Sequence, residues 1–414
     1  MKADIITIGD EILIGQILDT NSAKIAQMLT NIGFEIHQIK SVHDDKDQII
    51  STLEESLKEA SLVIFTGGLG PTDDDITKET LAEYFEMELT LNPDVLQDIV
   101  KFVGSKNKPL NEKNKSQAFV PSGCQILRNK FGTAPGMCFK KQENFIISLP
   151  AVPYEMENLM QTEVLPLLKK TFSLPRIRHE NVMIYGISES DLAEKLIAFE
   201  QELPSEIHLA YLPSPERIRL RLSLVEERSG QEEDRLQEQV RKLRDILGDL
   251  IFAEEDVFLE EVIANQLIAN NKTLSMAESC TGGMLAHLLT GIPGSSRFFK
   301  GGTVVYSNEA KIKYLTVPEN VLATHGAVSK EVVECMAEKQ SQFLDTDYAL
   351  AISGIAGPTG GSKEKPVGTV WIALAYRGSA VLSRKFLFGN NRAINIRRTS
   401  AAALNLLRLA IEGN

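Results

Sequence analysis

Two stretches of this chain alternate short β-branched runs with segments of helical periodicity, which is the pattern of a largely parallel sheet covered by helices. The first stretch covers residues 1–172 and the second covers residues 251–414. Between them, residues 173–250 contain two strand candidates and two polar helices, which is typical of a small α+β module. The sequence therefore predicts the α/β fold class, with two α/β domains, the C-terminal one in three layers, joined by a small α+β module.

The first domain shows its elements most clearly at three strands and one helix. The strand candidates are residues 3–9, 61–68 and 143–150. A helix is predicted over 19–33, with Thr20 or Asn21 as its N-cap and Gly33 as its stop.

Composition and charge exclude several classes of function. The formal net charge of -12 disfavours nonspecific nucleic-acid binding, because phosphate attracts Lys and Arg. The chain opens without the pattern of a signal peptide and has no apolar run of membrane-spanning length, so we expect a cytoplasmic protein with no membrane partner. The four cysteines lack CxxC spacing, which indicates reduced thiols rather than a zinc site or a disulfide framework.

The segment AESCTGG at 277–283 places a serine at the end of a predicted strand. Ser279 is followed by Thr281, Gly282 and Gly283, which open a predicted helix whose free N–H groups suit an anion. Taken alone, the same residues also fit an N-cap followed by a tight glycine turn. Cys280 is the rival nucleophile, although no histidine is adjacent in sequence to activate it.

The segment VVYSNEAK at 304–311 supplies two further candidates. Ser with Lys is a known way to provide a nucleophile and its base for hydrolysis of an amide. Tyr306 and Lys311 would complete such a set with Ser279, provided that burial lowers the pKa of the lysine. Read singly, the tyrosine is a core aromatic residue and the lysine a surface charge.

A long loop rich in Gly, Pro, Ser and Thr spans 353–368, and it has the composition of a ligand cradle. The backbone of Gly357 and Gly360 and the hydroxyl of Thr359 are candidates to hold a nucleotide phosphate. Arg392, at the start of the last helix, is a candidate phosphate partner, with an ordinary surface arginine as the alternative.

The N-terminal domain carries a second cluster in the string TGGLGPTDDDITK. Its candidate phosphate-binding residues are Gly67, Gly68, Gly70 and Thr72. Its candidate metal ligands are Asp73, Asp74 and Asp75, joined by Asp10 at the end of the first strand. The alternative is an acidic helix start favoured by the helix dipole.

These strings, together with HGAVS at 325–329, resemble the CinA family in the same order along essentially the whole chain. The C-terminal domain resembles stand-alone nicotinamide mononucleotide deamidases, whose Ser, Tyr and Lys match Ser279, Tyr306 and Lys311. That resemblance implies hydrolysis of the nicotinamide mononucleotide amide to nicotinic acid mononucleotide and ammonia, without a cofactor. It also implies a homodimer.

The N-terminal domain resembles the three-layer molybdopterin-binding fold of molybdenum cofactor biosynthesis proteins, although its LPAVP stretch has Ala151 where that pattern has glycine. In the CinA family this domain is associated with hydrolysis of ADP-ribose by a divalent metal ion of the Mg²⁺ or Co²⁺ class. Two alternatives remain open: a non-catalytic regulatory module that binds a pterin or nucleotide, and a competence or DNA-repair accessory protein. The acidic charge disfavours the second.

Overall fold

The computed structural model describes residues 1–107, 109–175, 177–225 and 232–413. The chain divides into two compact units, of which the first holds Met1–Arg178 and the second starts at His179. The second unit contains both the middle module and the C-terminal domain. In the described part, no helix has the length and apolar character needed to cross a membrane.

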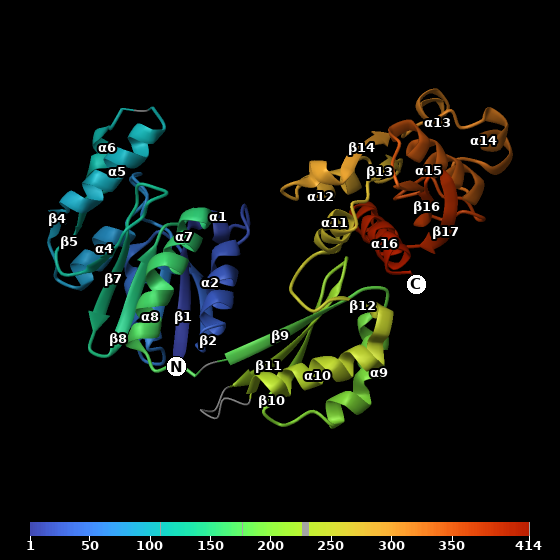
Figure 1. Ribbon diagram of the computed structural model, residues 1–414. Helices are drawn as coiled ribbons and strands as arrows, with labels where there is room; N and C mark the ends of the chain where they lie inside the picture. Colours follow the sequence, from blue (N-terminus) through green and yellow to red (C-terminus); the bar gives the residue numbers. More distant parts are fainter. Residues whose placement is uncertain (108, 176, 226–231, 414) are drawn as a thin grey trace. The chain divides into compact units, whose positions relative to one another are not determined.

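A six-stranded sheet in the order β2-β1-β3-β8-β7-β6 forms the centre of the first unit (Figure 1). Neighbouring strands from β2 to β8 are parallel, whereas β7 pairs antiparallel with both β8 and β6. The three predicted strands are confirmed as β1, β3 and β8. The strands are β1 (Lys2–Ile8), β2 (Glu35–Val42), β3 (Leu62–Thr66), β6 (Gln125–Leu127), β7 (Gly136–Lys141) and β8 (Asn144–Leu149).

Helices cover both faces of this sheet because successive side chains of each buried strand point to opposite faces. Ile5 of β1 packs in a core with α2 and α7, whereas Ile6 packs in a core with α3 and α4. The helices of the unit are α1 (Asp10–Leu13), α2 (Thr20–Thr30), α3 (Lys46–Ser56), α4 (Thr77–Tyr84), α5 (Pro93–Ser105), α6 (Glu112–Ser116), α7 (Pro153–Leu159), the π-helical turn η1 (Met160–Val164) and α8 (Leu165–Thr171). A short antiparallel pair, β4 (Leu89–Leu91) and β5 (Phe119–Pro121), flanks α5 and α6.

The expected N-cap of α2 is wrong. Its cap is Asp19, whose carboxylate accepts a hydrogen bond of 2.9 Å from the backbone N–H of Ser22. Asp, Asn and Ser all serve well as N-caps and exceed Thr only slightly, so the three adjacent residues Asp19, Thr20 and Asn21 competed closely. Asn21 instead donates to Thr66 and to the carbonyl of Ala151, which ties α2 to the end of β3.

The middle module is a four-stranded sheet in the order β10-β11-β9-β12, with α9 and α10 packed on one face. β11 alternates buried leucines with half-buried arginines, so Arg219 and Arg221 lie on the face opposite these helices. Its elements are β9 (Ile177–Ile184), α9 (Glu189–Gln201), β10 (Ile207–Pro213), β11 (Ile218–Val225), α10 (Glu232–Leu247), the 3-10 turn η2 (Gly248–Leu250) and β12 (Ile251–Ala253).

The C-terminal domain has a five-stranded sheet in the order β14-β13-β15-β16-β17. The adjacent strands β14, β13 and β15 are parallel, whereas β16 is antiparallel to β15 and β17 is antiparallel to β16. The strands are β13 (Leu274–Glu278), β14 (Phe299–Val304), β15 (Tyr348–Gly354), β16 (Thr369–Tyr376) and β17 (Ser379–Leu387).

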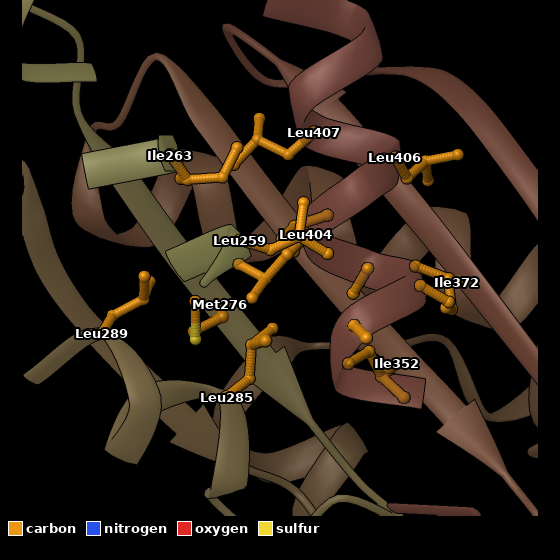
Figure 2. Close-up of a cluster of buried hydrophobic side chains, with 14 of the residues drawn as sticks. Leu259, Ile263, Met276, Leu285, Leu289, Ile352, Ile372, Leu404, Leu406 and Leu407 are labelled. Carbon is orange, nitrogen blue, oxygen red and sulfur yellow. The ribbon is translucent and has the colours of Figure 1, made fainter. Parts of the chain in front are cut away.

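Helices α11, α12 and α16 cover one face of this sheet, and α15 covers the other. Figure 2 shows Met276 of β13 among Leu259 of α11, Leu285 of α12 and Leu404 of α16. The helices are α11 (Leu259–Ala269), α12 (Met284–Thr290), the 3-10 turn η3 (Ser295–Arg297), α13 (Asn308–Leu315), α14 (Glu319–His325), α15 (Lys330–Leu344) and α16 (Arg392–Glu412). The expected three-layer arrangement is thus confirmed, and it brings the carboxyl ends of the parallel strands β13, β14 and β15 to one edge.

Candidate functional site

The side chain of Lys311 meets Ser279 at this edge. Ser279 directly follows β13, and Lys311 lies in the first turn of α13, which starts shortly after β14. The Nζ of Lys311 lies 3.0 Å from the Oγ of Ser279. The parallel pairing of β13 and β14 therefore joins two residues that are far apart in the sequence.

Burial gives this lysine an unusual environment. Lys311 is 1% exposed, and its Nζ donates hydrogen bonds to the carbonyl oxygens of Val305 at 2.8 Å and Tyr306 at 3.5 Å. No carboxylate pairs with it among the ion pairs of the described residues. Burial lowers the pKa of Lys311, and the nearby Cys280 opposes the shift. Glu309 is exposed and is not among the charges that shift the pKa of Lys311. The amine of Lys311 is thus suited to take up a proton from Ser279.

Cys280 is a poor rival for the nucleophile. Its side chain is buried, and burial raises the pKa of the thiol to about 12, although Lys311 and Arg392 oppose the shift. The thiolate is the reactive form of cysteine, and such a pKa leaves almost none of it near neutrality. The geometry therefore favours Ser279.

The expected anion site at the start of α12 is wrong. Glu278 is 1% exposed, and its carboxylate accepts hydrogen bonds from the backbone N–H groups of Gly283 at 3.0 Å, Leu285 at 3.2 Å and Ala286 at 2.8 Å. These are the groups that a helix start would otherwise offer to a ligand. Glu278 lies in the AESCTGG string, but only the three-dimensional turn shows that its side chain folds forward onto α12.

The turn between Ser279 and α12 depends on two glycines. Gly282 and Gly283 have φ angles of 63° and 101°, which side chains other than glycine rarely adopt. The turn buries Thr281, whose Oγ1 has no hydrogen-bond partner in the described structure. Buried hydroxyls are usually hydrogen-bonded, so this group is a candidate partner for a ligand.

The hydroxyl of Tyr306 does not bond to the reactive pair. Its side chain is 59% exposed, and its hydroxyl accepts a hydrogen bond of 2.9 Å from the guanidinium of Arg392 rather than bonding to Ser279 or Lys311. Arg392 also donates to the carbonyl oxygen of Gly357 at 3.1 Å. This arginine therefore links the segment after β14 to the glycine-rich loop.

The glycine-rich loop exposes two of its expected binding residues, Thr359 and Gly360, whereas Gly357 is buried. Positive φ angles at Gly357 and Gly360, of 90° and 89°, allow the loop to fold back on itself. Asn395 of α16 anchors it by donating to the carbonyl oxygen of Ala356 at 2.9 Å. Sequence patterns do not reveal that anchor, because an asparagine inside a helix has many roles.

The N-terminal glycine turn is tightly built. A Cβ at Gly67 would lie 2.1 Å from the carbonyl oxygen of Ile8, and one at Gly68 would lie 2.0 Å from the Oγ1 of Thr77. Asp75 accepts hydrogen bonds from the backbone N–H groups of Gly70 at 2.8 Å and Thr72 at 3.0 Å. It also accepts one from the Thr72 hydroxyl. Asp75 thus closes the turn.

The expected metal ligands do not form one set. The fully exposed Asp73 lies 3.7 Å from Lys113, and Asp10 bonds to His43 at 2.7 Å. A hydrogen bond with Thr72 lowers the pKa of Asp74. Over the described ranges, no group of three or more His, Cys, Asp or Glu side chains is placed to hold a metal ion. The four expected ligands are therefore spread over separate contacts in the described residues.

Asp44, which lies after β2, was not among the predicted site residues. Burial raises the pKa of Asp44, a hydrogen bond with the backbone of Asp10 opposes the shift, and the charges of Asp10, Glu11 and Asp74 add to it. Carboxylates of α1 and of the glycine turn therefore repel Asp44 at the edge of this sheet. Asp44 went unnoticed because β2 itself was not predicted.

Comparison with known proteins extends over the full chain. A CinA-like protein from Flavobacterium psychrophilum is 46% identical over 411 residues, which cover 98% of each chain. The chain belongs to the CinA family. A CinA-like protein from Cytophaga hutchinsonii is 43% identical, covering 98% of this chain and 97% of the relative.

Three family models match successive parts of this CinA chain. They are the probable molybdopterin binding domain over residues 4–170, the damage-inducible protein CinA KH domain over 179–253 and the CinA C-terminal domain over 256–411. A crystal structure of a CinA superfamily protein from Klebsiella pneumoniae is 35% identical with a TM-score of 0.37, and it covers 38% of this chain and 97% of that protein. The molybdopterin biosynthesis enzyme MoaB from a Thermus species is 20% identical with a TM-score of 0.28, covering 40% and 91%.

Proposed function

We propose that the C-terminal domain hydrolyses the amide of nicotinamide mononucleotide to nicotinic acid mononucleotide and ammonia. The contact that supports this proposal is the 3.0 Å approach of the buried Lys311 amine to the Ser279 hydroxyl. A neutral amine has two hydrogens and one lone pair. The carbonyl oxygens of Val305 and Tyr306 take up the two hydrogens, so the lone pair is available to Ser279.

In this mechanism Lys311 accepts the hydroxyl proton as the Oγ of Ser279 attacks the carboxamide carbon. The protonated amine then delivers that proton to the leaving nitrogen, which departs as ammonia and leaves an ester on Ser279. Water attacks the ester with Lys311 again as the base, and the carboxylate product is released. We propose that the hydroxyl of Thr281, which has no hydrogen-bond partner among the described residues, helps to stabilise the oxyanion.

Arg392 and the loop at 353–368 are proposed to bind the phosphate of the substrate. The guanidinium is exposed at the same strand edge and keeps further donors beyond those used by Tyr306 and Gly357. The decisive measurement is ammonia release and product identification with the purified chain and nicotinamide mononucleotide. Absence of product across a range of pH would overturn the proposal.

For the N-terminal domain we propose binding and hydrolysis of ADP-ribose with a divalent ion of the Mg²⁺ or Co²⁺ class. The support is the half-buried Asp44, because a bound cation would relieve the repulsion that three neighbouring carboxylates exert on it. The expected ligands do not form one set in the described residues. AMP formation from ADP-ribose, with and without added metal, tests the proposal. Saturable binding without turnover would instead favour a regulatory module.

The family resemblance leads us to propose a cytoplasmic homodimer. Sedimentation of the purified chain tests the dimer, and salt-dependent DNA binding would revive the accessory alternative.

A further inference from the structure

A cavity of about 620 Å³ lies in the second unit, where the turn between β10 and β11 meets α11, α12 and α16. This size is typical of sites for small molecules. The cavity includes neither Ser279 nor Lys311, so it is separate from the reactive pair. Its apolar lining includes Phe252, Phe258, Leu259, Leu288, Ala401 and Leu404. Figure 2 shows Leu259 and Leu404, which belong to both the domain core and this lining.

The two arginines at the cavity already have acidic partners. Arg397 lies 3.3 Å from Glu216. Arg217 lies 2.9 Å from Asp256, and its guanidinium lies 3.9 Å from the ring centroid of Phe258. An anionic ligand would therefore compete with existing carboxylates for both arginines.

Glu260 is different, because no ion pair of the described residues includes it. It lies half-buried in the first turn of α11 and lines the cavity. Burial raises the pKa of Glu260, Glu261 and Glu216 add to the shift, and Arg217 opposes it. A half-buried carboxylate that no cation contacts directly is destabilising, and a bound cation in contact with it would relieve that cost.

The aromatic lining favours the same kind of ligand. The face of an aromatic ring attracts organic cations. Phe258 already holds the guanidinium of Arg217, and Phe252 adds a second ring to the lining. We propose that this cavity binds a small organic cation with an apolar body, of the quaternary ammonium or N-substituted pyridinium type.

The cavity also touches the helix that follows the proposed nucleophile. Met284 and Leu288 of α12 line it, and Glu278 holds the first turn of the same helix. A bound cation would therefore influence the position of Ser279 through α12. That consequence rests on the proposed amidase function, whereas binding itself does not.

The test is a titration of the full chain with phenyltrimethylammonium, in which binding is monitored by ligand-observed NMR. We expect saturable binding that weakens by about tenfold in Glu260→Gln, because the variant loses the unpaired charge. Glu319→Gln is the matched control, since Glu319 is an exposed acid in the first turn of α14 outside the cavity. It should bind as the parent does.

A second variant and a second probe make the result decisive. Leu288→Trp fills part of the cavity and should abolish binding while the chain remains folded by circular dichroism. Benzenesulfonate, an anion of similar size, should bind more weakly than the cation. Three results would each overturn the proposal: no saturable binding of the cation, equal binding by Glu260→Gln, or tighter binding of benzenesulfonate. None of them depends on amidase activity.

Discussion

The carbonyl oxygen of Val305 accepts a hydrogen bond of 2.8 Å from the Nζ of Lys311. This bond and the longer one to Tyr306 hold the amine in place beside Ser279. Carbonyl oxygens accept hydrogens from either protonation state, so they do not oppose loss of the charge as a carboxylate would. The lysine is thereby positioned without being kept protonated.

Replacing Ser279 by Ala should abolish deamidation without unfolding the chain, because the change removes a nucleophile and only one oxygen atom. We expect a loss of several orders of magnitude in kcat, measured as ammonia release. Cys280→Ala should stay within about tenfold of the parent. A Ser279→Ala variant of near-parental activity would mean that another residue attacks the amide.

The deamidation rate should rise with pH through an apparent pKa below the ordinary lysine value of about 10.4, because only the neutral amine accepts the proton. This follows from the lowered pKa of Lys311. Lys311→Arg should be nearly inactive, since guanidinium does not deprotonate in this range. The pH profile of kcat checks this, and an active Arg variant would show that Lys311 only positions the substrate.

Lys311 should also affect stability in a pH-dependent way. The unfolded chain binds the lysine proton more tightly than the folded chain, so the folded state gains stability as pH rises from the lowered pKa toward about 10.4. Lys311→Met should lack this gain. We expect its free energy of unfolding, measured by urea denaturation, to exceed that of the parent most at low pH and least at high pH.

Glu278→Gln should lower kcat more than it raises KM. One amide oxygen cannot replace a carboxylate that accepts three backbone hydrogen bonds, so the turn after Ser279 should loosen. We expect a destabilisation of about 1–3 kcal/mol by urea denaturation. Glu309→Gln, a change at an exposed acid, is the control and should leave both quantities unchanged.

Arg392→Ala should raise KM for nicotinamide mononucleotide by about tenfold or more if its guanidinium binds the phosphate. Nicotinamide riboside lacks the phosphate. Comparing it with the mononucleotide separates phosphate binding by Arg392 from its contact with Tyr306. Turnover of the riboside should respond much less to the substitution. Equal losses for both substrates would assign Arg392 to holding the loop through Gly357.

In the N-terminal domain, Asp73→Asn should retain ADP-ribose hydrolysis and Asp75→Asn should lose it. Asp73 is fully exposed, whereas Asp75 closes the glycine turn through Gly70 and Thr72. AMP formation at limiting metal concentration measures both variants. Loss of activity in Asp73→Asn with activity retained in Asp75→Asn would instead place a metal ligand at Asp73.

Sequence patterns predict the strands and site residues best where a residue type has one dominant structural role. The β-branched runs identified β1, β3 and β8, and the strand-end serine with a lysine after the next strand indicated the reactive pair. β2 was missed because its EIHQIKSV run carries polar residues on a half-buried surface. The directions of the Glu278 and Tyr306 side chains depend on a folded turn and on Arg392, which local spacing does not contain.

The protonated thiol of Cys280, next to Ser279 in the sequence, affects how the site withstands oxidation. Peroxides attack the thiolate form of cysteine, and the raised pKa of Cys280 keeps that form scarce. A serine nucleophile is not itself oxidised in this way. The site should therefore keep its reactivity under oxidative stress, when enzymes that depend on an activated cysteine lose theirs.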